Sequence, residues 1–292
     1  MADEPAPPRR SPSPIPFKEK LRRRRKELGR ARSSDEEEPE DEPLGEGATV
    51  LHKLYGRRVT LHPGNIAKKS GKRICLQEAD ALRVAERAGL PVPHVHQVET
   101  TPDGKHHISM DYIEGQVLTK AWPEYSEVQK RAVVQQLREI LTIMRSIPPP
   151  EGYIGDCAGN QIRDTRLYFT HSAPACQDER GFNQFLIDAL VPEIPIPVHR
   201  AFVERWNRDD HRVVFTHSDI APRNIIVRDG NIVGLLDWED AGWYPEYWEY
   251  VKFFQRSSIA DGDWRNYADD IFPQPYHTEL VDYLALSRWQ YS

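Results

Sequence analysis

The stretch FTHSDIAPRNIIVRDGNIVGLLDWED, which runs from Phe215 to Asp240, sets a few polar side chains among apolar β-forming residues. Asp229 and Gly230 stand between its two apolar runs, NIIV and NIVGLL. This is a strong signal for a β-hairpin, because glycine accepts the positive φ of a tight turn. The pattern therefore predicts a hairpin with Asp229-Gly230 as its loop.

The polar residues of this stretch are predicted to meet at the open end of the hairpin. Pairing outward from the loop sets Asn224 opposite Leu235 and Asp237 opposite Pro222. Asp219 lies in the loop that leads to the same end. We therefore expect the Asp219, Asn224 and Asp237 side chains to converge.

A convergent Asp, Asn and Asp suits a magnesium–phosphate site. Magnesium takes oxygen ligands and is usually held by one or two carboxylates together with substrate phosphates. A further acid nearby can accept the proton of an attacking hydroxyl. His217, Asp219 and Asn224 reproduce the H-x-D-x-x-x-x-N spacing of the protein-kinase signature, and Asp237 begins DWE where D-F-G would stand.

The phrase THSDIAPRN, followed by GLLDWEDAGWYPEYWEY, resembles the aminoglycoside phosphotransferase and choline kinase-like family. Its fungal aminoglycoside phosphotransferase-like members are the most similar, judging by AGWYPEYWEY, RSIPPPEGYIG and LPVPHV. The resemblance covers residues 48 to 260 or so. It implies a kinase that moves the γ-phosphoryl group of ATP to a hydroxyl of a small molecule, on a protein kinase-like two-lobed fold.

The resemblance also implies roles for individual residues. Asp219 would be the catalytic base that orients the acceptor hydroxyl. Asn224 and Asp237 would bind the Mg2+ that bridges the phosphates of ATP. His217 would support the geometry of the loop and take no part in the chemistry.

In the first lobe, NIAKKSGKRICLQEADAL resembles the family's strand and helix that hold the nucleotide phosphates. This aligns Lys69 with the phosphate-binding lysine and Glu78 with its partner on the next helix. Lys68 is a competitor, because side chains alternate along a strand. Two solvated lysines near a turn are the remaining alternative, since most lysines are exposed.

The stretch ISMDYIEG matches the segment that links the lobes. Backbone groups of Asp111 and Ile113 would contact the adenine, and Met110 would lie behind it; an ordinary edge strand is the alternative. Two departures from the family are clear. Ser218 replaces the usual glycine after the histidine, and no G-x-G-x-x-G is present to cover the phosphates: GEGAT lies too early, and HPGN has one glycine.

The organisation of the chain agrees with two lobes of an α+β fold. Residues 1–45 are proline-rich and then strongly charged, and are predicted to be a disordered tail. Residues 46–114 show strand patterns around one helix that Gly89 ends, and form the expected nucleotide-binding lobe. Residues 115–292 form the expected larger catalytic and substrate lobe. It is mainly helical, with a helix capped by Ser126 and an apolar stripe of Val128, Val133, Leu137, Leu141 and Met144, and it is irregular over residues 150–180.

Composition favours a cytoplasmic protein with small-molecule partners. Its 292 residues carry a net charge of -6, and no apolar run approaches the ~20 residues of a membrane helix. The three cysteines show no paired spacing for a disulfide framework or a zinc site. The basic block from Lys18 to Lys26 is compatible with nuclear import, and is the one place where weak nucleic-acid binding is expected.

The acceptor and the oligomeric state are left open by the sequence. The segment after Asp237 holds acids that could attract an amine-bearing substrate or could form a solvated face: Glu239, Asp240, Glu246, Glu249, Asp261 and Asp263. Its aromatic residues favour a core over a pocket. A catalytically silent binding module and an atypical protein kinase are the alternatives to a small-molecule kinase.

Overall fold

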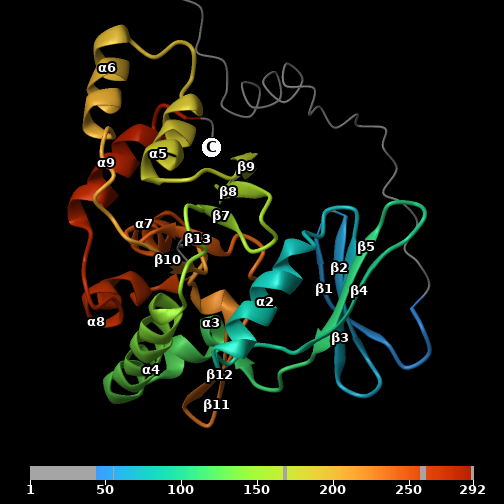
Figure 1. Ribbon diagram of the computed structural model, residues 1–292. Helices are drawn as coiled ribbons and strands as arrows, with labels where there is room; N and C mark the ends of the chain where they lie inside the picture. The colour runs from blue at the N-terminus through green and yellow to red at the C-terminus, as the bar shows by residue number, and fades with distance from the viewer. Residues whose placement is uncertain (1–43, 55, 167–169, 257–260, 291–292) are drawn as a thin grey trace, which may run out of the picture. The chain divides into compact units, whose positions relative to one another are not determined.

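The strand patterns of the first lobe form one antiparallel sheet in the order β1-β2-β3-β5-β4 (Figure 1). It is seen in a computed structural model that describes residues 44–54, 56–166, 170–256 and 261–290. The predicted tail therefore lies outside the described residues, except for residues 44 and 45. The strands are β1 (Thr49–Leu54), β2 (Arg57–His62), β3 (Ile66–Gly71), β4 (Val95–Thr100) and β5 (His106–Asp111).

The helix predicted for the first lobe is α2 (Gln77–Arg87), which packs against β4. It presents Ala79, Leu82 and Ala85 as buried residues on one side. Gly89 adopts a φ of +76° and ends the helix as predicted, since that backbone conformation suits glycine. The helix follows β3 in the chain, and this brings Glu78 in its first turn close to the strand.

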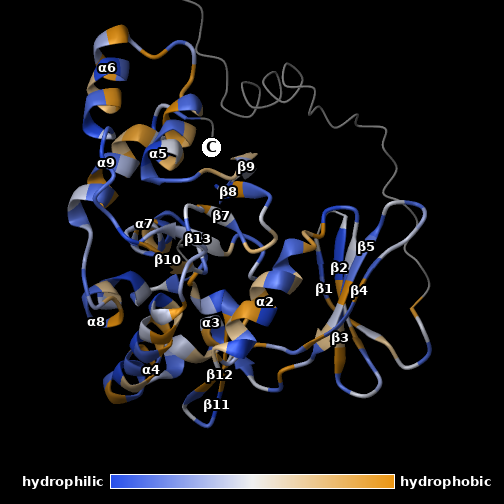
Figure 2. Cartoon of the chain, in the orientation of Figure 1, coloured by the Kyte–Doolittle hydropathy of each residue, from blue (hydrophilic) through white to orange (hydrophobic). Residues whose placement is uncertain are grey.

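Helix α4 (Glu127–Ser146) begins as the sequence predicts, with Ser126 and Gln129 in a capping box. Figure 2 shows hydrophobic and hydrophilic residues along its whole length. The predicted apolar stripe is buried from Val133 to Met144, where the helix packs against β10 and α8. Val128 is an error of the prediction, because it lies in the first turn and is 78% exposed.

The segment predicted to be irregular, residues 150–180, contains short strands. They are β7 (Gly155–Asp156), β8 (Gln161–Thr165) and β9 (Thr170–Pro174). β7 pairs with β13 (Gly242–Pro245), which pairs with β10 (Val213–Thr216). A Cβ at Gly242 would lie 2.2 Å from the Gly155 carbonyl oxygen, so the close approach of these two strands requires glycine. The partner of β7 lies almost 90 residues away in the chain, so local patterns do not reveal that strand, whereas β8 and β9 pair with each other.

The rest of the larger lobe is mainly helical, which confirms the α+β two-lobed class. Its aromatic residues are core, as favoured: Trp238, Tyr244 and Trp248 are each fully buried. Among the described residues, no helix combines the length and apolar character needed to cross a membrane. The remaining helices are α3 (Leu118–Ala121), η1 (Trp122–Glu124), α5 (Glu179–Asp188), α6 (Ile196–Arg205), α7 (Trp248–Gln255), η4 (Trp264–Tyr267), α8 (Ala268–Ile271) and α9 (His277–Ser287).

The predicted hairpin is present as β11 (Ile225–Arg228) and β12 (Asn231–Leu235), and β11 also pairs with β6 (Gln116–Val117). Its loop residues, Asp229 and Gly230, both have positive φ. The predicted pairing holds next to the loop, but a bulge shifts it between Val227 and Ile226. Ile225 therefore faces Leu235, which the prediction had assigned to Asn224.

Candidate active site

The loop that carries Asp219 leaves β10 at Thr216 and enters β11 through η2 (Pro222–Asn224). One buried carboxylate, Glu249 in the first turn of α7, holds its start. The Glu249 Oε2 and Oε1 atoms accept the backbone N–H of His217 (2.6 Å) and Ser218 (3.0 Å). Burial raises the pKa of Glu249 to about 7, although both hydrogen bonds act in the opposite direction.

His217 joins this loop to the segment that carries Asp237. Its Nε2 donates to the Leu236 carbonyl oxygen at 3.0 Å, and its Nδ1 accepts the Asp219 N–H at 3.1 Å. Burial lowers the pKa of His217, and a neutral ring with one donor and one acceptor fits both bonds. The side chain thus stands where the predicted supporting role requires it.

Asp219 is 2% exposed and surrounded by donors. Its Oδ1 accepts from Arg223 Nη2 and from Arg256 Nε (3.2 Å), and its Oδ2 accepts from Arg256 Nη2 (2.8 Å) and Asn224 Nδ2 (2.9 Å). Burial alone would raise the pKa of Asp219, but the hydrogen bond and charge of Arg256 and the charge of Arg223 lower it overall. Asp219 is therefore an ionised carboxylate at neutral pH.

Asn224 and Asp237 offer oxygen atoms on two adjoining segments, because the Leu236 N–H donates to the Asn224 carbonyl oxygen at 2.8 Å. The Asn224 amide nitrogen donates to the Asp219 backbone oxygen as well as to its side chain, each at 2.9 Å. The orientation leaves the amide oxygen as the acceptor of this side chain. Asp237 has a φ of +66° shortly after β12, and its side chain is 33% exposed. A carboxylate and an amide oxygen are ligands of the kind that Mg2+ prefers.

Lys69 is the lysine that contacts Glu78. Its Nζ lies 2.5 Å from Glu78 Oε1 and 3.0 Å from Asp237 Oδ1. Burial lowers the pKa of Lys69, but the charges of Asp237 and Glu78 more than compensate and raise it overall. The protonated amine thus joins the first lobe (β3 and α2) to the segment after β12. Lys68 faces Thr60 and Ser109 in the strand register.

The three residues expected to lie near the adenine differ in their surroundings. Met110 is buried. The Asp111 N–H donates to the His94 carbonyl oxygen (3.0 Å), so that group is already used within the sheet. A Cβ at Gly234 would lie 2.8 Å from Ile113 Cδ1, which shows that the Ile113 side chain packs on β12. Of the two glycine-bearing stretches considered for the phosphates, HPGN runs from the end of β2 through the β2–β3 turn, and GEGAT leads into the first residue of β1.

Four of the acids after Asp237 are buried and so do not form a solvated face: Glu239, Asp240, Glu249 and Asp261. Several of the acids are paired with bases or with backbone N–H groups, which neither of the two sequence interpretations foresaw. The contacts are Glu239–Arg57 (2.9 Å), Asp240–Arg163 (3.1 Å), Glu246–Arg212 (2.8 Å), Asp263–Lys130 (2.8 Å), and Glu249 with the loop described above. Sequence reasoning also missed Arg223 and Arg256 as neighbours of Asp219. Only Arg223 had a local signal, four residues after the aspartate.

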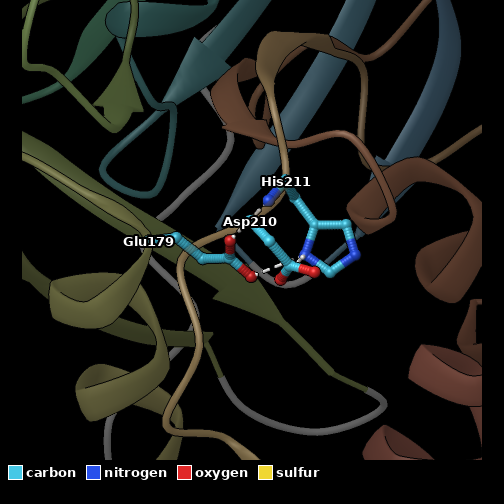
Figure 3. A group of neighbouring side chains, drawn as sticks. All are labelled: Glu179, Asp210 and His211. Atoms are coloured by element: carbon cyan, nitrogen blue, oxygen red, sulfur yellow. Dashed lines mark hydrogen bonds and ion pairs between the residues drawn. The ribbon is translucent and has the colours of Figure 1, made fainter.

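A further group of possible metal ligands consists of Glu179, Asp210 and His211 (Figure 3). His211 donates from its backbone N to Glu179 Oε2 (2.9 Å) and from its ring Nδ1 to Glu179 Oε1 (2.8 Å). Burial lowers the pKa of His211, but the hydrogen bond and charge of Glu179 raise it overall. Through these two contacts of Glu179 with His211, the group ties α5 to the segment before β10.

In the first lobe a lysine of the sheet contacts a helix glutamate. The helical lobe carries a loop with Asp and Asn, followed by another Asp. This combination defines a kinase-like phosphotransferase. Comparison with known proteins agrees. The pattern of the "Phosphotransferase enzyme family" (APH) matches residues 66–283. The chain belongs to this family, and is therefore a phosphotransferase of the kinase type.

Individual relatives are distant. Aminoglycoside 3'-phosphotransferase from Enterococcus faecalis is 21% identical over 235 residues, which cover 78% of this chain and 83% of the relative. Two solved structures share the fold. A thermostable mutant of aminoglycoside phosphotransferase APH(4)-Ia, in ternary complex with AMP-PNP and hygromycin B, has a TM-score of 0.59 at 16% identity and covers 83% of this chain and 84% of its own. APH(2")-IIIa with GDP and kanamycin has a TM-score of 0.52 at 14% identity, covering 86% and 84%. The greater likeness to fungal members stays a prediction.

Proposed function

We propose that the protein transfers the γ-phosphoryl group of ATP to a hydroxyl of a small molecule. The observation that carries the proposal is the contact of Lys69 with both Glu78 and Asp237. The residue before Asp237, Leu236, is in turn hydrogen-bonded to Asn224, which contacts Asp219. Phosphoryl transfer depends on positioning and charge stabilisation and needs no covalent nucleophile, which suits this set of side chains. The relatives named above include complexes with a nucleotide and an aminoglycoside.

In the proposed reaction the acceptor hydroxyl oxygen forms a bond to the γ-phosphorus, and the bond from that phosphorus to the β–γ bridging oxygen breaks. The hydroxyl proton passes to Asp219, and ADP leaves. Lys69 binds the α- and β-phosphates of ATP, and Glu78 holds its amine in place. The backbone around Asp111 and Ile113 receives the adenine, with Met110 behind it.

Asn224 and Asp237 would hold Mg2+, since their oxygen atoms fit a hard cation. When bound, the ion neutralises charge on the β- and γ-phosphates. We further propose residues 46–114 as the nucleotide-binding lobe and residues 115–292 as the catalytic and substrate lobe.

A catalytically silent binding module is a second candidate, and one observation favours it. Asp219 already accepts four hydrogen bonds, two of its donors being arginines, so a hydroxyl finds no vacant acceptor position in this conformation. Activity requires one donor to move away. The atypical protein kinase has no comparable support.

Calorimetric titration of MgATP into the full chain tests the proposal, with Asp237→Ala and Asp219→Ala as variants. We expect saturable heat in the wild type, loss of that heat in Asp237→Ala, and retained binding in Asp219→Ala. A screen of hydroxyl acceptors then follows, in which Asp219→Ala should abolish transfer. Binding of MgATP without transfer to any acceptor would favour the silent module, and equal turnover by both variants would refute the assigned roles.

A further inference from the structure

The donors around Asp219 differ in how firmly they are held. Arg256 is 15% exposed, and it also donates from Nη1 to the Thr165 carbonyl oxygen (3.1 Å) and lies 3.6 Å from Asp240 Oδ2. The Arg223 side chain is 37% exposed. Within the described chain it donates to Asp219 and, apart from that, only to the Arg256 carbonyl oxygen (3.2 Å). Arg223 is therefore the donor that an incoming molecule reaches and can displace.

An anion on the incoming molecule would give a displaced Arg223 a new partner. Leaving the buried Asp219 without its donors is strongly unfavourable, whereas Arg223, 37% exposed, would otherwise be left to water. The acceptor hydroxyl can satisfy Asp219, but a hydroxyl gives Arg223 nothing comparable. A carboxylate or phosphate matches the planar fork of arginine with two parallel hydrogen bonds.

The other charges near Asp219 offer little to an amine. Asp240 accepts from Arg163 Nε (3.1 Å) and from Thr165 Oγ1 (2.8 Å), besides its contact with Arg256. Asp164 is fully buried between Lys252 (2.7 Å) and Arg166 (2.6 Å). An ammonium group would have to displace one of these bases, whereas an anion meets arginine side chains directly.

Resting on the function proposed above, we propose that the acceptor carries a carboxylate or phosphate group close to the hydroxyl that is phosphorylated. This anionic group binds Arg223 and draws it from Asp219, while Arg256 stays in place. Asp219 Oδ1 then accepts the hydrogen of the acceptor hydroxyl. Arg223 thus selects an anionic acceptor and couples its arrival to the release of the base.

The nucleotide is the other possible source of an anion for Arg223. Lys69, its proposed phosphate ligand, lies on β3 and contacts Asp237, a proposed Mg2+ ligand. Arg256 contacts Thr165 instead, and Arg223 contacts the Arg256 carbonyl oxygen at the end of α7. We therefore assign Arg223 to the acceptor. The test compares both sources.

The experiment uses matched probes that differ in one group: D-glucuronate, D-glucose and D-glucosamine, together with inorganic phosphate. Their binding to the full chain is measured by calorimetry, with and without saturating Mg–AMP-PNP. We expect the two anions to bind roughly 10- to 100-fold more tightly than glucose, the range for hydrogen bonds to a charged group, with glucosamine weakest. Arg223→Gln should remove this preference, because the two anions lose the guanidinium that binds them.

The matched control is Arg212→Gln, because Arg212 pairs with Glu246 on an exposed part of the chain. It should leave every binding constant unchanged. Preferred binding of glucosamine, or an anion preference that survives in Arg223→Gln, would overturn the inference, as would failure of both anions to bind. Anion binding that is lost in the presence of Mg–AMP-PNP, together with weaker MgATP binding by Arg223→Gln, would assign Arg223 to the nucleotide. That result would overturn the inference as well.

This outcome is separable from the fate of the proposed function. Anion binding is measured without turnover, so it decides the role of Arg223 even if no acceptor is phosphorylated. Absence of Asp237-dependent MgATP heat would refute the proposed function alone. Transfer to glucose and glucosamine but not to glucuronate would support phosphoryl transfer and overturn the anionic acceptor.

Discussion

Replacing Ser218 by glycine should make the protein more stable. Ser218 has a φ of +68°, a left-handed backbone conformation that costs an L-residue ~1–2 kcal/mol. Its hydroxyl oxygen is buried and has no hydrogen-bond partner among the described residues. Glycine removes both costs, and its backbone N–H can still donate to Glu249.

The size of the effect follows from these contributions. Loss of an unpaired buried hydroxyl should contribute about 1 kcal/mol in both Ser218→Ala and Ser218→Gly. Glycine also relieves the left-handed strain, offset by ~0.5–1 kcal/mol of extra entropy in the unfolded chain. We therefore expect the free energy of unfolding to rise by about 1 kcal/mol for alanine and about 1.5–2 kcal/mol for glycine.

Urea denaturation of the wild type and the two variants measures these differences directly. In a thermal scan the glycine variant should melt roughly 3–8 °C higher than the wild type, at ~2–4 °C per kcal/mol for a protein of this size. Ser146 provides the control, because it is exposed at the end of α4, and Ser146→Gly should give no gain. A glycine variant less stable than the alanine variant would show that Ser218 is not strained.

Other residues of the two lobes give further predictions. Lys69→Met should lower the free energy of unfolding by about 3–5 kcal/mol, because Glu78 and Asp237 lose their shared cation. Urea denaturation measures this loss. The double variant with Glu78→Met should recover part of the lost stability. Glu249 loses its proton near pH 4.5 when unfolded and about 7 when folded, so it reduces stability as pH rises through this window, by about 3 kcal/mol in all. Glu249→Gln should remove that dependence in urea titrations at a series of pH values, whereas Glu246→Gln should keep it. The pKa of His211 is raised in the folded state, so its contribution to the free energy of unfolding is complete below pH 6.5 and is lost as pH rises through the folded pKa. His211→Gln should therefore flatten the dependence of the free energy of unfolding on pH above 6.5. An unchanged dependence would contradict the ion pair with Glu179.

Local patterns predicted the parts of the site that depend on neighbours in the sequence. The turn at Asp229 and Gly230 and the helix ended by Gly89 follow from the backbone freedom of glycine. The contact of Lys69 with Glu78 was expected from the family resemblance, and Lys68 remained possible, because a strand pattern alone does not say which of two adjacent lysines points inward.

Contacts between distant residues could not be predicted in this way. The bulge in β12 depends on how the hairpin packs, and Ile113 lies against Gly234 at that point. Glu249 and Arg256 reach the Asp219 loop from 30 or more residues away, and in the sequence both resemble ordinary surface charges. The paired acids were misjudged for the same reason, since a count of charges does not show which base each one meets.

The position of α7 has a consequence for insertions and deletions. Glu249 in its first turn holds the start of the Asp219 loop, and Arg256, directly after its last residue, holds the aspartate itself. The helix thus fixes the distance between the two side chains that hold this loop, about seven residues or ~10 Å along its axis. Adding or removing a single residue would turn Arg256 by about 100° relative to Glu249. Length variation in this fold should therefore be tolerated in the loops around α7 and not within it.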